Sequence, residues 1–232
     1  MNILAIETSS EACSCALLSA AGIVESYEVA PRRHTQLLLA MIDQVLHESA
    51  LQLRDVDLFA YGQGPGSFTG VRIAACAVQA LALAQQRPVV PISSLAAAAL
   101  RGASGAPRVI AAFDARLGEV YVGAFSIAAD GTVVAVGEEQ LAAPGAVALP
   151  CAEAWVGVGA GWAAHGGVLR SRMGARLHAV DAQVLPGAAQ VAALAAACPQ
   201  AGVAAASAVP RYLRRDVATP RAGAQAPAMT SC

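Results

Sequence analysis

The pattern of hydrophobic and polar positions along the chain predicts a mixed α/β protein. Strands are expected where short apolar runs are bounded by turn residues, and helices where apolar residues recur every three to four positions. In the first half of the chain the expected strands are 2–6, 12–18, 22–29, 56–61 and 88–92, and the expected helices are 34–50, 71–85 and a short alanine-rich segment from 94. A three-stranded meander followed by alternating helices and strands is therefore predicted for this half.

The second half of the chain begins on the same plan as the first. After the turn-rich loop 101–107, the segment 109–125 again has an apolar strand that ends at a carboxylate, then a short turn and a second strand. The two carboxylates, Glu7 and Asp114, lie close to half a chain length apart. Such internal similarity is typical of two lobes with a common plan.

The remaining pattern sets the expected domain limits. Further strands are expected at 132–136 and 154–158, a helix at 188–197, and no periodicity from 219 onward. We therefore expect an N-terminal lobe over 1–102, a C-terminal lobe over 107–217 and a disordered tail over 218–232.

A glycine-rich turn, YGQGPGSFTGVRI at 61–73, joins an expected strand to an expected helix. Its glycines, Gly64 and Gly66 among them, let other atoms approach the backbone, and Ser67 and Thr69 can accept hydrogen bonds from the first N–H groups of the helix. A helix N-terminus is also a ready anion site. Two interpretations stay open, an anion site or only a well-capped loop. A Walker P-loop is excluded because the motif's lysine is missing.

Glu7 and Asp114 are candidates to hold a magnesium nucleotide between the lobes, since carboxylates are preferred ligands of that ion. The alternative is that they cap backbone groups at strand ends. The candidate nucleotide or anion site as a whole comprises Glu7, Thr8, Gly64, Gly66, Ser67, Thr69 and Asp114. The four histidines show no metal-binding spacing, so neither a metal site nor a catalytic residue is predicted.

Composition narrows the function further. The chain has 232 residues, is 56% hydrophobic and carries a formal net charge of -1. It lacks the basic bias of a stand-alone nucleic-acid-binding protein, and its one dense basic run is RYLRR at 211–215. All 15 basic residues are arginine, which excludes Schiff-base chemistry on lysine. The six cysteines lack the spacing of a disulfide scaffold or a zinc site. The sequence also shows no signal peptide and no apolar run of membrane-spanning length, and together these features favour a cytoplasmic protein.

Two helices are expected to form a partner interface. The apolar residues of the helix 34–50 span roughly 200° of its circumference, about twice what one core contact needs. Leu38, Ile42 and Val45 are expected in the core. The helix 71–85 carries many alanines, which let another helix approach, so two helices could pair with two from a related subunit. The predicted interface residues are Leu37, Met41, Leu46, Ala74 and Ala77. The alternative is that both helices bury these faces against their own sheet.

Several segments together resemble one known family. They are ILAIETS at 3–9, PRRHTQLL at 31–38, the glycine-rich turn at 61–73, DARLGEVY at 114–121 and PRYLR at 210–214. This set is similar to the TsaB family, also called YeaZ, whose members are accessory subunits of bacterial tRNA threonylcarbamoyladenosine synthesis. The resemblance extends to about residue 217. It implies the two-lobed fold of the actin-like, sugar-kinase and heat-shock ATPase (ASKHA) superfamily.

The resemblance also implies a function. In the catalytic sibling family, TsaD, two histidines four residues apart hold the active-site metal; here Ser94 and Ala98 stand at the corresponding places. These residues cannot supply the required ligands. The resemblance thus implies a non-catalytic partner that binds and activates TsaD, together with TsaE. That complex transfers a threonylcarbamoyl group from its adenylate to N6 of the adenosine next to the anticodon, in tRNAs that read codons beginning with A.

Cofactors and partners follow from the same resemblance. No intrinsic cofactor is expected, and ATP or ADP with magnesium would be shared with the complex. Contact with tRNA would occur through the complex, and the isolated chain could form a homodimer. Glu7 departs from the superfamily's usual aspartate, and its longer side chain weakens the case for intrinsic nucleotide binding. A stand-alone ATPase or small-molecule kinase of the same fold is the alternative; a metallopeptidase is disfavoured by the absence of paired histidines.

Overall fold

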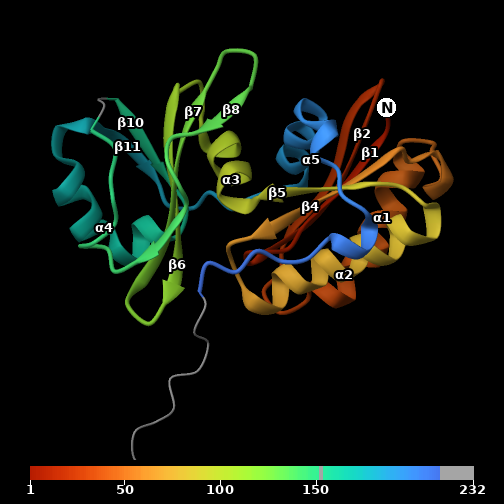
Figure 1. Ribbon diagram of the computed structural model, residues 1–232, viewed down its shortest axis with the longest axis horizontal. Helices are drawn as coiled ribbons and strands as arrows, with labels where there is room; N and C mark the ends of the chain where they lie inside the picture. Colours follow the sequence, from red (N-terminus) through yellow and green to blue (C-terminus); the bar gives the residue numbers. More distant parts are fainter. Residues whose placement is uncertain (152–153, 215–232) are drawn as a thin grey trace, which may run out of the picture.

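The computed structural model describes residues 1–151 and 154–214 of the chain. The first lobe is built on a five-stranded mixed sheet with the order β3-β2-β1-β4-β5 (Figure 1). Its strands are β1 (Ile3–Glu7), β2 (Ala12–Ser19), β3 (Gly22–Val29), β4 (Leu58–Gly64) and β5 (Val89–Ser93). The first three form an antiparallel meander, and β4 and β5 continue the sheet in parallel with β1. The meander predicted from the sequence is confirmed.

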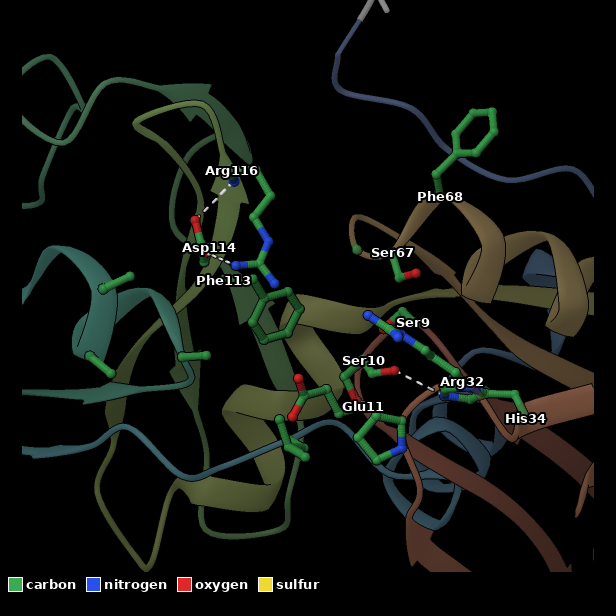
Figure 2. Close-up of a pocket in the computed structure, with 16 residues that line it drawn as sticks. Ser9, Ser10, Glu11, Arg32, His34, Ser67, Phe68, Phe113, Asp114 and Arg116 are labelled. Atoms are coloured by element: carbon green, nitrogen blue, oxygen red, sulfur yellow. Dashed lines mark hydrogen bonds and ion pairs between the residues drawn. The ribbon is translucent and has the colours of Figure 1, made fainter.

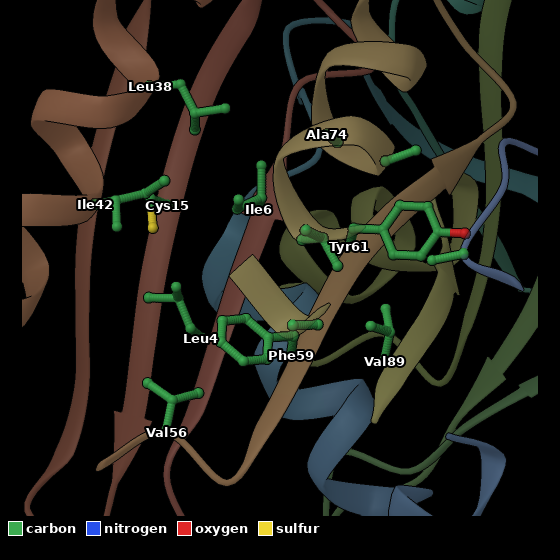
Figure 3. Packing of buried hydrophobic residues seen from close by; sticks show 14 of the residues in the cluster. Leu4, Ile6, Cys15, Leu38, Ile42, Val56, Phe59, Tyr61, Ala74 and Val89 are labelled. Carbon is green, nitrogen blue, oxygen red and sulfur yellow. The ribbon is translucent and has the colours of Figure 1, made fainter. Parts of the chain in front are cut away.

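Helices cover both faces of this sheet. One face packs against α1 (His34–Glu48) and α2 (Phe68–Gln85), and the other against α3 (Ser94–Gly102) and α5 (Ala188–Ala197). Because side chains alternate along a strand, Leu4 and Ile6 face the first pair of helices and Ile3 and Ala5 face α5. Figure 3 shows the first of these layers, where Leu4, Ile6 and Phe59 meet the α1 residues Leu38 and Ile42.

The second lobe has a six-stranded sheet with the order β11-β10-β6-β7-β8, and β9 pairs with β7. Its strands are β6 (Arg108–Arg116), β7 (Glu119–Ile127), β8 (Val133–Ala135), β9 (Gln140–Ala142), β10 (Trp155–Val158) and β11 (Leu177–Asp181). On one face, α4 (Gly161–Met173) packs through Trp162, Leu169 and Met173. On the other, Leu95 and Ala98 of α3 pack against the sheet, so α3 lies between the two lobes (Figure 1).

The last described segment returns to the first lobe. Ala188 at the start of α5 donates its N–H to Ser14 Oγ of β2 at 2.9 Å. The 3₁₀ turns η3 (Pro199–Ala201) and η4 (Ala205–Ser207) follow, and Val203 forms an antiparallel bridge with Val89 of β5. The expected C-terminal lobe over 107–217 is therefore wrong for residues 188–214, because the apolar face of the first sheet needs α5 to cover it. The expected tail, 218–232, lies outside the described residues.

The α/β, two-lobed fold class is confirmed, and the differences in detail have local causes. Helix α2 begins at Phe68 rather than at 71, because Ser67 caps it by accepting a hydrogen bond from the Gly70 N–H. Strand β6 runs through Asp114 to Arg116 instead of ending at the carboxylate. The elements α4, β9 and β11 were not predicted. Two further 3₁₀ turns, η1 (Leu53–Asp55) and η2 (Gly174–Arg176), complete the described elements.

Candidate functional site, a cleft between the lobes

A cleft of about 980 Å³ lies between the two lobes (Figure 2). The first lobe lines it with the β1–β2 turn, the segment leading into α1 and the start of α2, and the second lobe with β6 and α4. Its polar lining residues are Ser9, Ser10, Glu11, Arg32, His34, Ser67, Asp114 and Arg116. Two phenylalanines, Phe68 and Phe113, are among the apolar ones. Of the candidate-site residues predicted from the sequence, Gly66, Ser67 and Asp114 line this cleft.

The structure places Glu7 beneath the cleft and not in it. The side chain is fully buried. Its Oε1 accepts a hydrogen bond from the Ser9 N–H at 2.6 Å, and its Oε2 accepts one from Ser94 Oγ at 2.8 Å. Burial raises the pKa of Glu7 above its ordinary value, although the hydrogen bonds from Ser9 and Ser94 act in the opposite direction. Both carboxylate oxygens are thus engaged within the protein, and the expectation that Glu7 holds a magnesium nucleotide is wrong.

The glycine-rich turn packs against the β1–β2 turn. Thr8, which is fully buried, donates from Oγ1 to the Gly70 carbonyl at 2.8 Å, and the Ser67 N–H donates to the Ser9 carbonyl at 2.7 Å. The Gly70 N–H is bonded to Ser67 Oγ at 3.3 Å. A Cβ at Gly66 would overlap the Ser9 backbone. These glycines therefore make room for a neighbouring turn, which favours the capped-loop interpretation over the anion site.

The remaining predicted residues of the turn lie apart. Gly66 and Ser67 line the cleft, whereas Gly64 and Thr69 do not. Gly64 has φ +104°, a backbone conformation that side-chain-bearing residues rarely adopt, and lies near the backbone of Arg211. Thr69 is exposed on α2. The structure therefore brings only part of the predicted anion site to the cleft.

Asp114 does line the cleft, and it is engaged by a neighbouring arginine. Its Oδ1 accepts the Arg116 N–H at 2.8 Å, and its Oδ2 lies 3.0 Å from Arg116 Nη1. Nε2 of His165 on α4 lies 3.5 Å from the same Oδ1. Asp114 and Glu7 are not brought together, because one lies in the cleft and the other beneath it.

Other cleft residues were not singled out by the sequence. Figure 2 shows Arg32 from the first lobe and Arg116 from the second extending toward the middle of the cleft. Glu11 also lines the cleft. The only feature of the sequence that could have indicated this is its position two residues after Ser9. His34, one of the four histidines that lack metal-binding spacing, donates from Nε2 toward the carbonyls of Ser10 and Ala12 at 3.0 and 3.2 Å. Since both partners are acceptors, this nitrogen carries the hydrogen.

The position expected to correspond to the metal ligands of TsaD is closed. Ser94 and Ala98 lie one turn apart on α3, and both are fully buried. The Ser94 hydroxyl is committed to Glu7, and alanine has no donor atom. Within residues 1–151 and 154–214, no group of three His, Cys, Asp or Glu side chains is close enough together to hold a metal ion.

The predicted interface residues divide by burial. Met41 is 5% exposed and Ala74 is fully buried, so naming these two as interface residues was wrong. Both pack in the core between the helices and the sheet, because the inward arc of each helix is wider than expected. Leu37, Leu46 and Ala77 are half-buried at the edge of the same core. Leu38, Ile42 and Val45 are buried as predicted.

The outward face of the two helices is apolar in part. Leu39 of α1 and Leu83 of α2 are 67% and 68% exposed. Helix α2 has 18 residues with a mean hydropathy of 1.3, so by length and composition alone it could cross a membrane, which the sequence analysis did not anticipate. Its residues Val71, Ala75 and Val78 are nevertheless buried on the sheet, as in a core helix of a folded lobe.

The basic run at 211–214 is used inside the chain. Arg211 Nη1 lies 3.1 Å from Glu139, and Arg214 Nη2 lies 2.6 Å from Glu119. Arg214 also donates to the Ala115 carbonyl at 3.0 Å. These two arginines are therefore already paired with carboxylates and are not available to bind phosphates. Arg215 lies outside the described residues.

The duplicated lobes around one cleft define the class of protein, the two-lobed ASKHA fold. The family model described as "TsaD: tRNA N6-adenosine threonylcarbamoyltransferase" matches residues 19–221. The tRNA threonylcarbamoyladenosine biosynthesis protein TsaB of Escherichia coli K12 is 42% identical over 170 residues, which cover 71% of this chain and 73% of that protein. The Haemophilus influenzae protein of the same name is 48% identical over 123 residues, 52% of each chain. The chain belongs to the TsaB (YeaZ) family of tRNA threonylcarbamoyladenosine biosynthesis proteins.

A solved structure agrees with this assignment. The structure described as YeaZ from Pseudomonas aeruginosa superposes with a TM-score of 0.84 and 45% sequence identity, covering 91% of this chain and 99% of that one. At this identity the likeness extends to sequence as well as fold.

Proposed function

We propose that this chain is a non-catalytic subunit that binds and activates TsaD, with TsaE as a further partner. The reaction served is the transfer of a threonylcarbamoyl group to N6 of the adenosine next to the anticodon in tRNAs that read codons beginning with A. One observation carries the non-catalytic part: the Ser94 and Ala98 positions are buried, and Glu7 uses the Ser94 hydroxyl. A chain with this arrangement cannot build the TsaD metal site there.

The nucleotide that the fold class implies does not fit the residues present. Glu7 is sealed off, and the start of α2 is occupied by the β1–β2 turn through the bond from the Ser67 N–H to the Ser9 carbonyl. We therefore assign no intrinsic cofactor, and ATP or ADP with magnesium would be handled by the complex. The same observation disfavours a stand-alone ATPase or kinase. From the proposed function in tRNA modification we infer a cytoplasmic location.

The outward face of α1 and α2 is the surface proposed for TsaD. Leu39 and Leu83 are exposed there, and exposed apolar surface on a pair of helices is typical of a site that a partner protein covers. Two helices can pair with two helices of a related lobe in a four-helix arrangement. The isolated chain would self-associate weakly through the same face, and tRNA would be met through the complex.

A reconstitution tests the proposal. TsaD, TsaE and an enzymatic source of threonylcarbamoyl-adenylate are incubated with tRNA, with and without this chain, and modified adenosine is measured by mass spectrometry. The expected result is formation that depends on this chain, with no ATP turnover in the ordinary enzymatic range of about 1–1,000 per second by the chain alone. Modification at the same rate without the chain, or rapid turnover by it alone, would contradict the proposal.

A further inference from the structure

The start of α2 carries an exposed arginine held between two aromatic rings. The Arg72 guanidinium carbon lies 3.7 Å from the centroid of the Phe68 ring and 5.7 Å from that of Tyr212. Arg72 Nε also donates to the Tyr212 hydroxyl at 2.7 Å. The two rings are themselves 5.8 Å apart, with a tilt of 37°. We call Phe68, Arg72 and Tyr212 the arginine clamp.

The clamp fixes the arginine, and no carboxylate among residues 1–151 and 154–214 pairs with its charge. Among the described residues Arg72 takes part in no ion pair, and Nε is the one nitrogen with a hydrogen bond. Phe68 and Tyr212 are 48% and 44% exposed. A guanidinium held flat by stacking loses little further side-chain entropy when its two terminal nitrogens bind a carboxylate in the bidentate way.

The surroundings of the clamp favour a protein partner over RNA. Along the outward stripe of α2, Arg72 is followed by Cys76, Gln79, Ala80 and Leu83, which with Ala206 form a shallow hollow. Arg72 is the one charged residue between 68 and 85. An RNA interface needs several cations to neutralise phosphates, and Arg211 and Arg214 nearby are already paired with glutamates.

We propose that the arginine clamp receives a carboxylate of TsaD and is an energetic anchor of the interface along α2. An arginine flanked by aromatic residues and surrounded by apolar contacts is the usual composition of a binding hot spot. The clamp is continuous with the outward face of α2 assigned to TsaD above, so this inference rests on the proposed function. It adds a specific residue and the acidic chemistry of its partner.

The test measures the dissociation constant of the full chain for TsaD of the same organism by calorimetry. Arg72→Ala and Arg72→Lys are compared with wild type, and Arg170→Ala, an exposed arginine on α4, is the matched control. We expect Arg72→Ala to weaken binding at least about tenfold, Arg72→Lys by an intermediate factor, and the control by less than about twofold. Rising salt should weaken wild-type binding more steeply than Arg72→Ala binding.

The outcomes separate the two proposals. If wild type does not bind TsaD, both the proposed function and the clamp fail. If wild type binds TsaD and both Arg72 variants bind it as tightly as wild type does, only the clamp proposal fails. Loss of tRNA binding without loss of TsaD binding in Arg72→Ala would overturn the protein partner in favour of RNA. If Arg72→Ala lowers the melting temperature by several degrees while TsaD affinity is unchanged, the clamp serves the stability of the chain itself. Melting temperatures of the Arg72 variants near that of wild type exclude misfolding as the cause.

Discussion

Replacing Ser94 by alanine tests whether the buried Glu7 network closes the candidate site. The substitution removes the hydroxyl that donates to Glu7 Oε2 and leaves the bond from the Ser9 N–H to Oε1 in place. Both Ser94 and Glu7 are fully buried, so water does not readily replace the lost donor. Leaving one partner of a buried hydrogen bond without its donor costs about 1–3 kcal/mol. We expect the free energy of unfolding above the folded pKa of Glu7 to fall by about 2 kcal/mol.

The size of this loss should depend on pH. In the folded chain, burial raises the pKa of Glu7 above its ordinary value of 4.5, the value expected after unfolding. Between the two pKa values the folded chain binds more protons than the unfolded chain, so this group's contribution to stability falls as pH rises, and it is constant above the folded pKa. The Ser94 hydroxyl favours the ionised form. Its loss raises the folded pKa further, and Ser94→Ala should therefore cost less below the folded pKa of Glu7 than above it.

Urea unfolding at about pH 4 and about pH 9 measures both effects. Glu7→Gln provides the matched background, because its side chain has nearly the same shape and does not titrate. In that background Ser94→Ala should cost a smaller amount that is the same at both pH values. An equal loss at both pH values in the Glu7 background, or a loss below about 0.5 kcal/mol at the higher pH, would refute the reasoning.

Three further predictions follow from packing and exposure. Gly70→Ala should destabilise the chain by about 3 kcal/mol in urea unfolding, because a Cβ there overlaps the Thr8 carbonyl; Gly145→Ala, which meets nothing within 4 Å, should change stability by less than about 1 kcal/mol. Leu83 is exposed, so Leu83→Arg should keep the melting temperature of wild type but no longer capture TsaD, whereas a charge at the buried Met41 should unfold the chain. Capture of TsaD by a folded Leu83→Arg variant would show that the interface lies elsewhere. Arg214→Ala should speed hydrogen exchange over 205–214, and unchanged exchange would show that its ion pair does not hold this segment.

The elements that the sequence predicted well are those with a strong local pattern. The strands β1 to β5 and the helices α1 and α5 were found because apolar periodicity and turn residues mark them within a short window. Helix α4 has no such pattern. Its sequence contains Gly166 and Gly167, and it is held by Trp162 and Leu169 packing on the second sheet. That contact is a tertiary one, so no local window contains it.

The assignment of α5 to a lobe could not be predicted for a related reason. Its sequence, AAQVAALAAA, is apolar around most of its surface and would suit either sheet. The choice is made by specific partners on the first lobe, such as Ser14, whose Oγ accepts the Ala188 N–H. Such a pairing joins residues far apart in the sequence and leaves no trace in periodicity.

The errors at the candidate site share a cause. A carboxylate at the end of a strand has the same sequence pattern whether it faces a cleft or turns back, as Glu7 does, to the Ser9 N–H. Glycines that admit a phosphate likewise look the same as glycines that admit a neighbouring backbone, which is what Gly66 and Gly70 do. Met41 was misplaced because an apolar arc wider than one contact needs also fits a helix that packs on both the sheet and a neighbouring helix.

The described C-terminal segment, up to residue 214, contacts both lobes. On the first lobe, the Arg211 N–H donates to the Gln63 carbonyl and the Tyr61 hydroxyl to the Val209 carbonyl, each at 2.8 Å. The side chains of Arg211 and Arg214 then bind glutamates of the second lobe. Opening the lobes would break these contacts. Because the β1–β2 turn already occupies the start of α2, nucleotide binding there would not compensate for their loss. A fixed lobe arrangement suits the docking role proposed above, since a preorganised surface loses less entropy when its partner binds. The same segment also brings Tyr212 to Arg72, so the tie between the lobes and the arginine clamp are parts of one structure.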